Sequence, residues 1–153
     1  MARHVLSKKD MKIFFEKLRE NNLWADFFSN SNIEVEEHKG KKCYSIGGRF
    51  IAYEEDRLLP SIDLLNAIKP EISSVTVDNG AVPHILNGAK LFGKGITQIG
   101  ESIRPGSLVY VKDPTGRFIA VGIATKSTEE LKVSREGPAA EIIMSPAKNP
   151  CTQ

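Results

Sequence analysis

The sequence predicts an α+β module in the first half of the chain, followed by a mostly-β domain that closes into a barrel. Two observations support this division. Apolar residues first repeat with a helical period and then alternate, and the 12 glycines and 8 prolines require many turns. A chain of 153 residues is long enough for two small domains. We therefore expect short strands rather than a helical bundle.

The N-terminal module begins with a predicted helix. Ser7 and Asp10 resemble a capping box with Asp in place of Glu. Four apolar residues follow at the spacing of one helix face: Met11, Phe14, Phe15 and Leu18. A second short helical segment is expected over residues 23–28, where Trp24 and the phenylalanines are predicted to form a small core. The alternative for these aromatic side chains is a platform on which nucleic-acid bases stack.

A small antiparallel meander and another helix complete this module. Strands are predicted at residues 33–35, 43–46 and 49–53. A helix is expected over residues 60–68, with Pro60 in its first turn, and Lys69-Pro70 ends it. Pro70 marks the expected domain boundary. The predicted divisions are residues 1–72 for the first domain, 73–147 for the second and 148–153 for a tail.

The second domain is predicted to contain a series of short strands. Residues 74–77 are β-branched and predict a strand. A turn at residues 78–80 and a short helix over residues 81–87 follow it. Further strands are expected at 90–92, 107–112, 117–124 and 137–143, with one helical turn at 127–131. The turn at 113–116 predicts that its flanking strands are antiparallel, and Gly122 predicts a bulge. Residues 145–153 are expected to be frayed.

Charge and hydropathy narrow the possible partners. The formal charge is +2, and the excess lies in the second half: residues 73–126 contain six basic and three acidic side chains, whereas residues 1–72 contain twelve of each. This bias suits a ligand with a phosphate backbone, although a solvated face would look similar. Neither a secretory leader nor an apolar run of membrane-spanning length is visible. We therefore expect a cytoplasmic protein with no membrane partner.

Residues that could perform catalysis or bind a metal are sparse. The three histidines are scattered, and no Ser or Cys lies in a nucleophile elbow. Asp78 and His84 could pair, but a lone histidine on a short helix is more often a surface or capping residue. The acidic residues 54–56 are interpreted as a solvated corner rather than a metal site. We expect no catalytic residue, no metal and no cofactor.

Neither the Gly-Lys-Gly motif nor the two cysteines indicate a site of chemistry. Gly93-Lys94-Gly95 superficially resembles a phosphate loop, but it lacks the Gly-Lys-Ser/Thr ending and the long helix that follows such a loop. Cys43 and Cys151 lie far apart in the sequence, and they are expected to be an unpaired core thiol and an unpaired tail thiol.

The region between residues 75 and 96 has the features of a binding surface. Gly80, Gly88, Gly93 and Gly95 allow a ligand to approach the main chain closely, although tight turns alone would also explain each glycine. Lys90 and Lys94 add cations beside these turns. The combination favours the phosphate backbone of a nucleic acid.

Several segments of the second domain also match a known pattern in the expected order. They are Val77-Asp78-Asn79-Gly80-Ala81, Ile85-Leu86-Asn87-Gly88-Ala89, Leu91-Phe92-Gly93-Lys94-Gly95-Ile96, Ile103-Arg104-Pro105-Gly106-Ser107-Leu108-Val109 and Ala120-Val121-Gly122-Ile123-Ala124. Together they resemble the PUA domain, an RNA-binding pseudobarrel named after pseudouridine synthase and archaeosine transglycosylase. The resemblance covers residues 74–143. It implies an α+β N-terminal module followed by a mostly-β PUA pseudobarrel.

The resemblance also implies where RNA binds. PUA domains use the short helix after the first strand, the glycine turn and the adjoining strand to hold RNA, often a tRNA acceptor end. By position this nominates Gly80, Ala81, His84, Gly88, Ala89, Lys90, Leu91, Phe92, Gly93, Lys94 and Arg104. The last strand is expected near the same groove. Ser107 stands where many PUA domains have Asp.

The layout of the whole chain is similar to archaeal relatives of the malignant T-cell amplified sequence family of translation factors. This implies a non-catalytic RNA-binding protein that binds tRNA or rRNA, with the small ribosomal subunit or a translation factor as a possible further partner and no DNA. The alternative is an accessory or RNA-targeting subunit of a tRNA or rRNA modification enzyme. A stand-alone enzyme that uses Asp78 and His84 is the third hypothesis.

Overall fold

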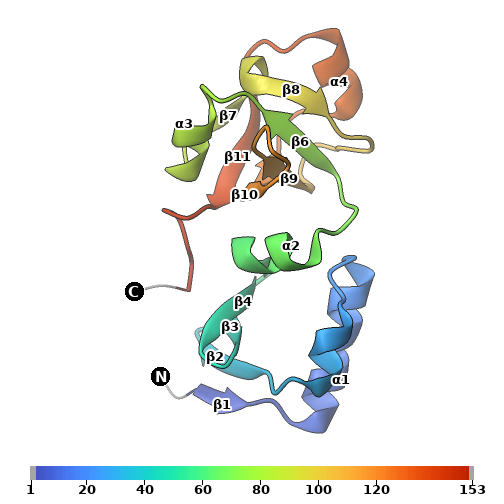
Figure 1. Ribbon diagram of the computed structural model, residues 1–153, viewed down its shortest axis with the longest axis vertical. Helices are drawn as coiled ribbons and strands as arrows, with labels where there is room; N and C mark the ends of the chain where they lie inside the picture. Colours follow the sequence, from blue (N-terminus) through green and yellow to red (C-terminus); the bar gives the residue numbers. More distant parts are fainter. Residues whose placement is uncertain (1–2, 152–153) are drawn as a thin grey trace. The chain divides into compact units, whose positions relative to one another are not determined.

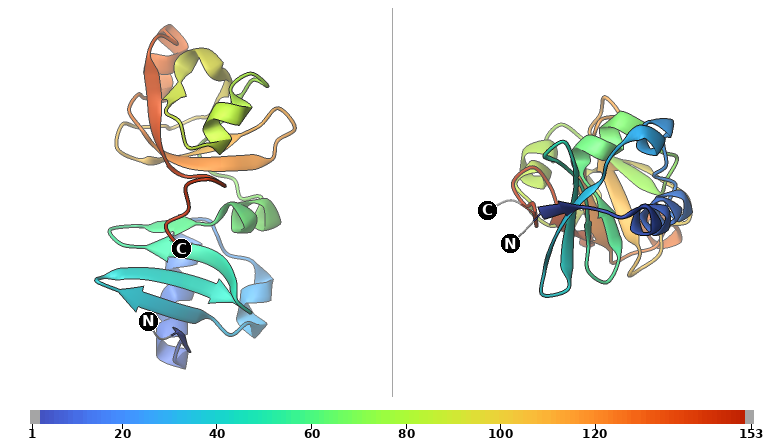
Figure 2. Two further views of the ribbon diagram at one scale, coloured as in Figure 1. Left: turned by 90° about the vertical axis from the view of Figure 1, so that its left-hand side faces the viewer. Right: turned by 90° about the horizontal axis from the view of Figure 1, so that it is seen from below.

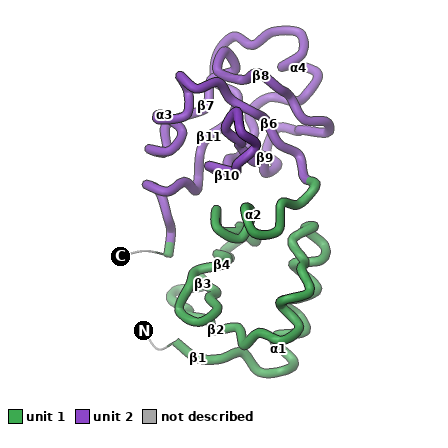
Figure 3. The backbone as a smooth tube through the Cα atoms, in the orientation of Figure 1, with its two compact units in different colours: residues 1–71, 151–153 green, residues 72–150 purple. Residues whose placement is uncertain are grey.

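The computed structural model describes residues 3–151, which form two compact units (Figure 3). Unit 1 contains the described residues up to Glu71 together with Cys151, and unit 2 runs from Ile72 to Pro150. The division thus falls between residues 71 and 72. No helix of the described residues is long and apolar enough to cross a membrane.

Unit 1 contains a five-stranded antiparallel sheet with the strands in chain order (Figure 1). The strands are β1 (Arg3–Val5), β2 (Glu34–His38), β3 (Lys41–Ile46), β4 (Arg49–Glu54) and β5 (Leu58–Pro60). The predicted meander is confirmed as β2, β3 and β4. The short outer strands β1 and β5 were not predicted, because three residues give too little alternation to be recognised.

Helix α1 (Lys8–Glu20) lies against one face of this sheet, as the left view of Figure 2 shows. Its N-terminus is capped as predicted, since the Asp10 amide donates to Ser7 Oγ at 3.1 Å. Phe14 is buried and stacks on Tyr44, with 4.1 Å between the ring centroids. The predicted aromatic core is therefore confirmed, except that Phe27 is 46% exposed.

The two remaining helical segments of unit 1 differ in detail from the prediction. Residues 26–30 form a 3-10 helix, η1 (Asp26–Asn30). Helix α2 (Ile62–Ile68) begins two residues after Pro60, and Ser61 is its N-cap, with Oγ accepting from the Leu64 amide at 2.9 Å. Pro60 instead ends the edge strand β5, where a residue without an N–H is tolerated. Lys69 ends α2 in the left-handed conformation.

Unit 2 is built on a six-stranded sheet in the order β7-β11-β10-β9-β6-β8. The strands are β6 (Ser74–Val77), β7 (Leu91–Phe92), β8 (Ile96–Ile99), β9 (Leu108–Lys112), β10 (Phe118–Ala124) and β11 (Pro138–Met144). Strands β9 and β10 are antiparallel, as predicted. Strand β8 and the parallel pairing of β6 with β9 were not predicted.

The chain connectivity forces this sheet to curl. Strands β7 and β8 are at opposite edges of the strand order, yet η2 (Gly93–Gly95) joins them directly. Six strands laid flat place their outer members about 24 Å apart, whereas so short a connection reaches at most about 14 Å. The sheet must therefore close on itself. The predicted mostly-β pseudobarrel is confirmed.

Three local features shape the pseudobarrel. The register of β10 and β11 shifts between Val121 and Gly122, which confirms the predicted bulge. Helix α3 (Val82–Leu86) follows β6, and Ile85 anchors it in the core. Helix α4 (Thr128–Val133) begins with a capping box formed by Ser127 and Glu130.

The end of the chain is more ordered than the sequence indicates. After β11, the Ser145 amide donates to Lys148 O at 3.1 Å and the Ala147 amide to Leu86 O at 3.3 Å, so this segment packs on α3. The expectation of a frayed segment from residue 145 is thus wrong up to residue 151, and residues 152 and 153 lie outside the described part.

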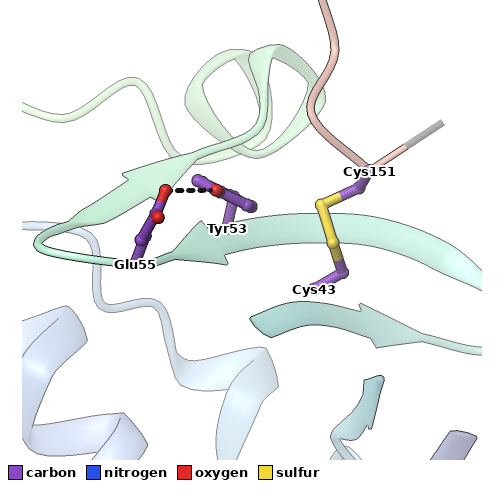
Figure 4. Close-up of a disulfide and its surroundings, with 4 residues drawn as sticks. All are labelled: Cys43, Tyr53, Glu55 and Cys151. Atoms are coloured by element: carbon purple, nitrogen blue, oxygen red, sulfur yellow. Dashed lines mark hydrogen bonds between the residues drawn. A yellow bond between two sulfur atoms is a disulfide. The ribbon is translucent and has the colours of Figure 1, made fainter. Parts of the chain in front are cut away.

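Cys43 and Cys151 form a disulfide (Figure 4), so the expectation of two unpaired thiols is wrong. A separation of 108 residues gives no sequence signal for this pairing. Next to the disulfide, the Tyr53 hydroxyl donates to Glu55 Oε1 at 2.8 Å. Partial burial and this bond to a carboxylate raise the pKa of Tyr53 to about 12.

Candidate functional site

One open cavity of about 470 Å³ lies between α3 and the β7–η2 segment of unit 2. Most of its lining is apolar. The lining residues are Asp78, Ala81, His84, Ile85, Ala89, Lys90, Leu91, Phe92, Lys94 and Gly95. We call it the α3–β7 cavity.

Asp78 sets the position of α3 relative to η2. Its backbone amide donates to Gly95 O at 2.8 Å, and its Oδ1 accepts from the Ala81 amide, also at 2.8 Å. The carboxylate therefore closes the turn that leads into α3. Ile85 is 2% exposed and fixes the other side of the helix in the core. Together these contacts hold the two walls of the cavity.

The cavity brings together seven of the eleven residues nominated for RNA binding: Ala81, His84, Ala89, Lys90, Leu91, Phe92 and Lys94. The nominated residues outside the lining are Gly80, Gly88, Gly93 and Arg104. Asp78, Ile85 and Gly95 also line it. Of these three, Gly95 was predicted among the glycines of the binding region, whereas Asp78 and Ile85 were not nominated for RNA binding.

Packing within the protein explains two of the nominated glycines. A Cβ atom on Gly93 would lie 2.5 Å from the carbonyl oxygen of Arg135, so the protein's own backbone occupies that space. At Gly88 the backbone has a φ of +83°, and a Cβ atom would lie 3.2 Å from the Lys148 side chain. Packing and backbone conformation are therefore sufficient to explain both glycines. Their contact with a ligand stays a prediction.

Arg104 lies in the connection between β8 and β9. Ser107 Oγ donates to Arg104 O at 2.6 Å, so the serine closes the turn that contains Arg104. The Arg104 side chain is exposed, but it does not line the cavity.

Phe92 is the exposed aromatic residue of the site. It is 54% exposed, whereas its neighbour Leu91 is 1% exposed. Alternation along β7 therefore points Leu91 into the core and leaves Phe92 on the surface. The site thus presents an aromatic ring next to an apolar cavity with two lysines in its lining.

Both of these lysines have acidic partners that the sequence analysis missed. Lys90 Nζ lies 3.3 Å from Glu141 Oε1, and Lys94 Nζ lies 3.5 Å from Glu136 Oε1. The glutamates come from β11 and the segment before it, more than 40 residues further along the chain. The expectation that the last strand lies near the groove is confirmed.

The site offers little for catalysis. Asp78 Oδ1 is already bonded to the Ala81 amide, and within residues 3–151 no hydrogen bond joins Asp78 to His84. Within the same range, no group of three or more His, Cys, Asp or Glu side chains could hold a metal ion.

The curled sheet, the short helix after its first strand and the cavity beside that helix define a PUA-type pseudobarrel. Comparison with known families agrees: residues 73–144 match the model of the PUA domain, and residues 2–68 match a domain of unknown function, DUF1947. The chain belongs to the family of PUA-domain proteins in which a DUF1947 module precedes the PUA domain.

Three relatives cover both units. A solved structure titled as a conserved PUA domain protein from Thermoplasma acidophilum is 38% identical, with a TM-score of 0.88, over 97% of this chain and 96% of that one. An uncharacterized Methanocaldococcus jannaschii protein is 30% identical over 90% of this chain and 87% of its own length. Translation machinery-associated protein 20 of Saccharomyces cerevisiae is 29% identical over 74% of this chain and 67% of its own length.

Proposed function

We propose that this protein is a non-catalytic RNA-binding protein of the translation machinery and that it holds tRNA or rRNA at the α3–β7 cavity. The observation that supports RNA most directly is the exposed ring of Phe92 beside an apolar cavity lined by Lys90 and Lys94. An aromatic face can stack on an unpaired base, and lysines next to it can contact the adjoining phosphates.

The relatives support the association with translation. The yeast relative is named for the translation machinery and matches 74% of this chain, which is more than unit 2 alone, so part of unit 1 is included. We infer that this protein acts in the cytoplasm and that unit 1 contacts a further partner, either the small ribosomal subunit or another translation factor.

The engagement of Asp78 supports a role without catalysis. One of the two Asp78 carboxylate oxygens accepts from the Ala81 amide, which gives this side chain a structural role at the start of α3. Asp78→Asn and His84→Ala variants should therefore lose no more function in cells than their loss of RNA affinity explains.

Gel-shift titrations with tRNA and rRNA fragments test the proposal. Lys90→Glu combined with Lys94→Glu should weaken binding by about 10- to 100-fold, and the slope of log affinity against log salt should fall by about 2, because two phosphate contacts are lost. Unchanged affinity and unchanged salt dependence would exclude this surface.

A matched control comes from the opposite part of the same unit. Lys132 on α4 is also exposed and also paired, with its Nζ 3.2 Å from Glu101 Oε1, but it lies outside the cavity lining. Lys132→Glu changes the net charge by as much as the single variant Lys90→Glu does, so these two single variants are compared. The control should bind nearly as well as the wild type, and an equal loss in both would indicate a general charge effect rather than a site.

A further inference from the structure

Each lysine of the α3–β7 cavity is partly neutralised by a glutamate of the same unit. The pairs are Lys90 with Glu141 at 3.3 Å and Lys94 with Glu136 at 3.5 Å. Between 44% and 76% of each of these four side chains is exposed. Ion pairs this exposed are weak and open easily, so an incoming phosphate can replace the carboxylate.

The backbone holds the partners of each pair close together. In the β7–β11 register, Ala140 is opposite Leu91, which places Glu141 and Lys90 directly beside this pairing. The Gly93 amide donates to Gly137 O at 2.9 Å, which places the neighbouring residues Lys94 and Glu136 next to each other. The sheet therefore keeps the two side chains of each pair within reach of each other.

A third lysine fixes the segment that contains Glu136. Lys126, which follows β10, donates from Nζ to the backbone carbonyl oxygen of Glu136. This contact uses the main chain and leaves the Glu136 carboxylate available to Lys94. Lys126 thus contacts the main chain of Glu136, whereas Lys94 contacts its carboxylate.

We propose that Glu136 and Glu141 are competing anions of the RNA site, which occupy Lys94 and Lys90 until RNA phosphates replace them. This inference rests on the proposed function. RNA must break both pairs to use both lysines, so the glutamates lower the affinity for any RNA whose phosphates reach them. They make the site weaker than its lysines alone would allow.

Binding of a short poly(U) RNA, measured by fluorescence anisotropy at low salt, tests the proposal. Glu136→Gln and Glu141→Gln should each tighten binding by about 3- to 10-fold, because each removes one charge close to a lysine in water. Glu101→Gln, which releases Lys132 outside the cavity, is the matched control and should leave the affinity nearly unchanged.

Swapped double variants separate competition for a particular lysine from simple repulsion of RNA. The gain from Glu141→Gln should shrink in a Lys90→Gln background and persist in a Lys94→Gln background, and the reverse should hold for Glu136→Gln. If a glutamine variant gains the same RNA affinity in the Lys90→Gln and Lys94→Gln backgrounds, the glutamate does not compete for one particular lysine, and the proposal is overturned.

The outcomes also distinguish this inference from the function on which it rests. If Lys90→Glu weakens RNA binding but neither glutamine variant strengthens it, the competing role is wrong and the RNA site stands. If Lys90→Glu and Lys94→Glu leave binding unchanged, the proposed function itself fails. A gain in Glu101→Gln as large as that in the site variants would also overturn the competing role.

Discussion

Cys43 in β3 and Cys151 near the C-terminus are covalently joined, with their Cα atoms 5.9 Å apart. The disulfide encloses residues 43–151, a range that includes all of unit 2, in one closed covalent loop. A crosslink across so long a segment lowers the entropy of the unfolded chain more than a short one does. The chain-entropy model assigns it about 3 to 5 kcal/mol.

Removal of the disulfide should therefore destabilise the oxidised protein. Cys151→Ser is expected to lower the urea midpoint, with a loss in the free energy of unfolding of about 3 to 5 kcal/mol. A reducing agent should shift the wild type to the same midpoint and leave Cys151→Ser unchanged. Two reactive thiols in unfolded, unreduced wild-type protein would contradict the pairing.

Glu54 joins α1 to the sheet of unit 1. Its carboxylate accepts from Lys17 Nζ at 2.7 Å and from the Tyr44 hydroxyl at 2.8 Å. Burial alone would raise the pKa of Glu54, but these two bonds outweigh it and hold the pKa below the ordinary value. Burial and the bond to Glu54 raise the pKa of Tyr44.

Glu54→Gln should therefore cost about 1 to 3 kcal/mol at neutral pH, since it removes a charged acceptor from partly buried donors. A lowered carboxyl pKa gives stability above the unfolded-state pKa of about 4.3, and this stability is lost as the pH falls through the folded-state value. The difference between wild type and variant should thus shrink in acid unfolding curves. Glu16→Gln, on the exposed side of α1, is the control and should have little effect at either pH.

Packing within unit 2 is sufficient to explain Gly93. Gly93→Ala would place a Cβ atom 2.5 Å from Arg135 O, which the backbone can relieve only by moving. We expect a loss of about 1 to 3 kcal/mol in thermal or urea unfolding. Gly80→Ala is the matched control, because its Cβ atom would lie 3.4 Å from Asp78 Oδ1, an ordinary contact. Equal stability of the two variants would refute this reading.

Leu91 and Phe92 are neighbours in β7. Alanine variants of the two should separate an effect on stability from an effect on RNA binding. Leu91→Ala should cost about 2 to 5 kcal/mol of stability, because its side chain is buried in the core of unit 2. Phe92→Ala should change stability little and weaken RNA binding by about 5- to 100-fold through lost stacking. Gel shifts and thermal melts of both variants check this, and an unaltered affinity in Phe92→Ala would argue against base stacking there.

The sequence by itself determines much of the local structure. The spacing of Phe14 and Leu18 predicts α1, and the β-branched run before Asp78 predicts β6. The turn that follows Asp113 predicts the antiparallel pairing of β9 and β10. These features are recognisable because each depends on residues a few positions apart, whose periodicity records which face is buried. The α+β layout with a mostly-β second unit follows from them.

The tertiary structure decides the relations between distant residues. It pairs Cys43 with Cys151, fills the space beside Gly93 with the backbone of Arg135, and brings Glu141 to Lys90. The sequence shows lysines next to glycine turns, which predicts cations beside the groove but not their acidic partners. Strand order and register instead bring carboxylates from β11 to the same place. Such pairings depend on how the sheet closes, which no local periodicity records.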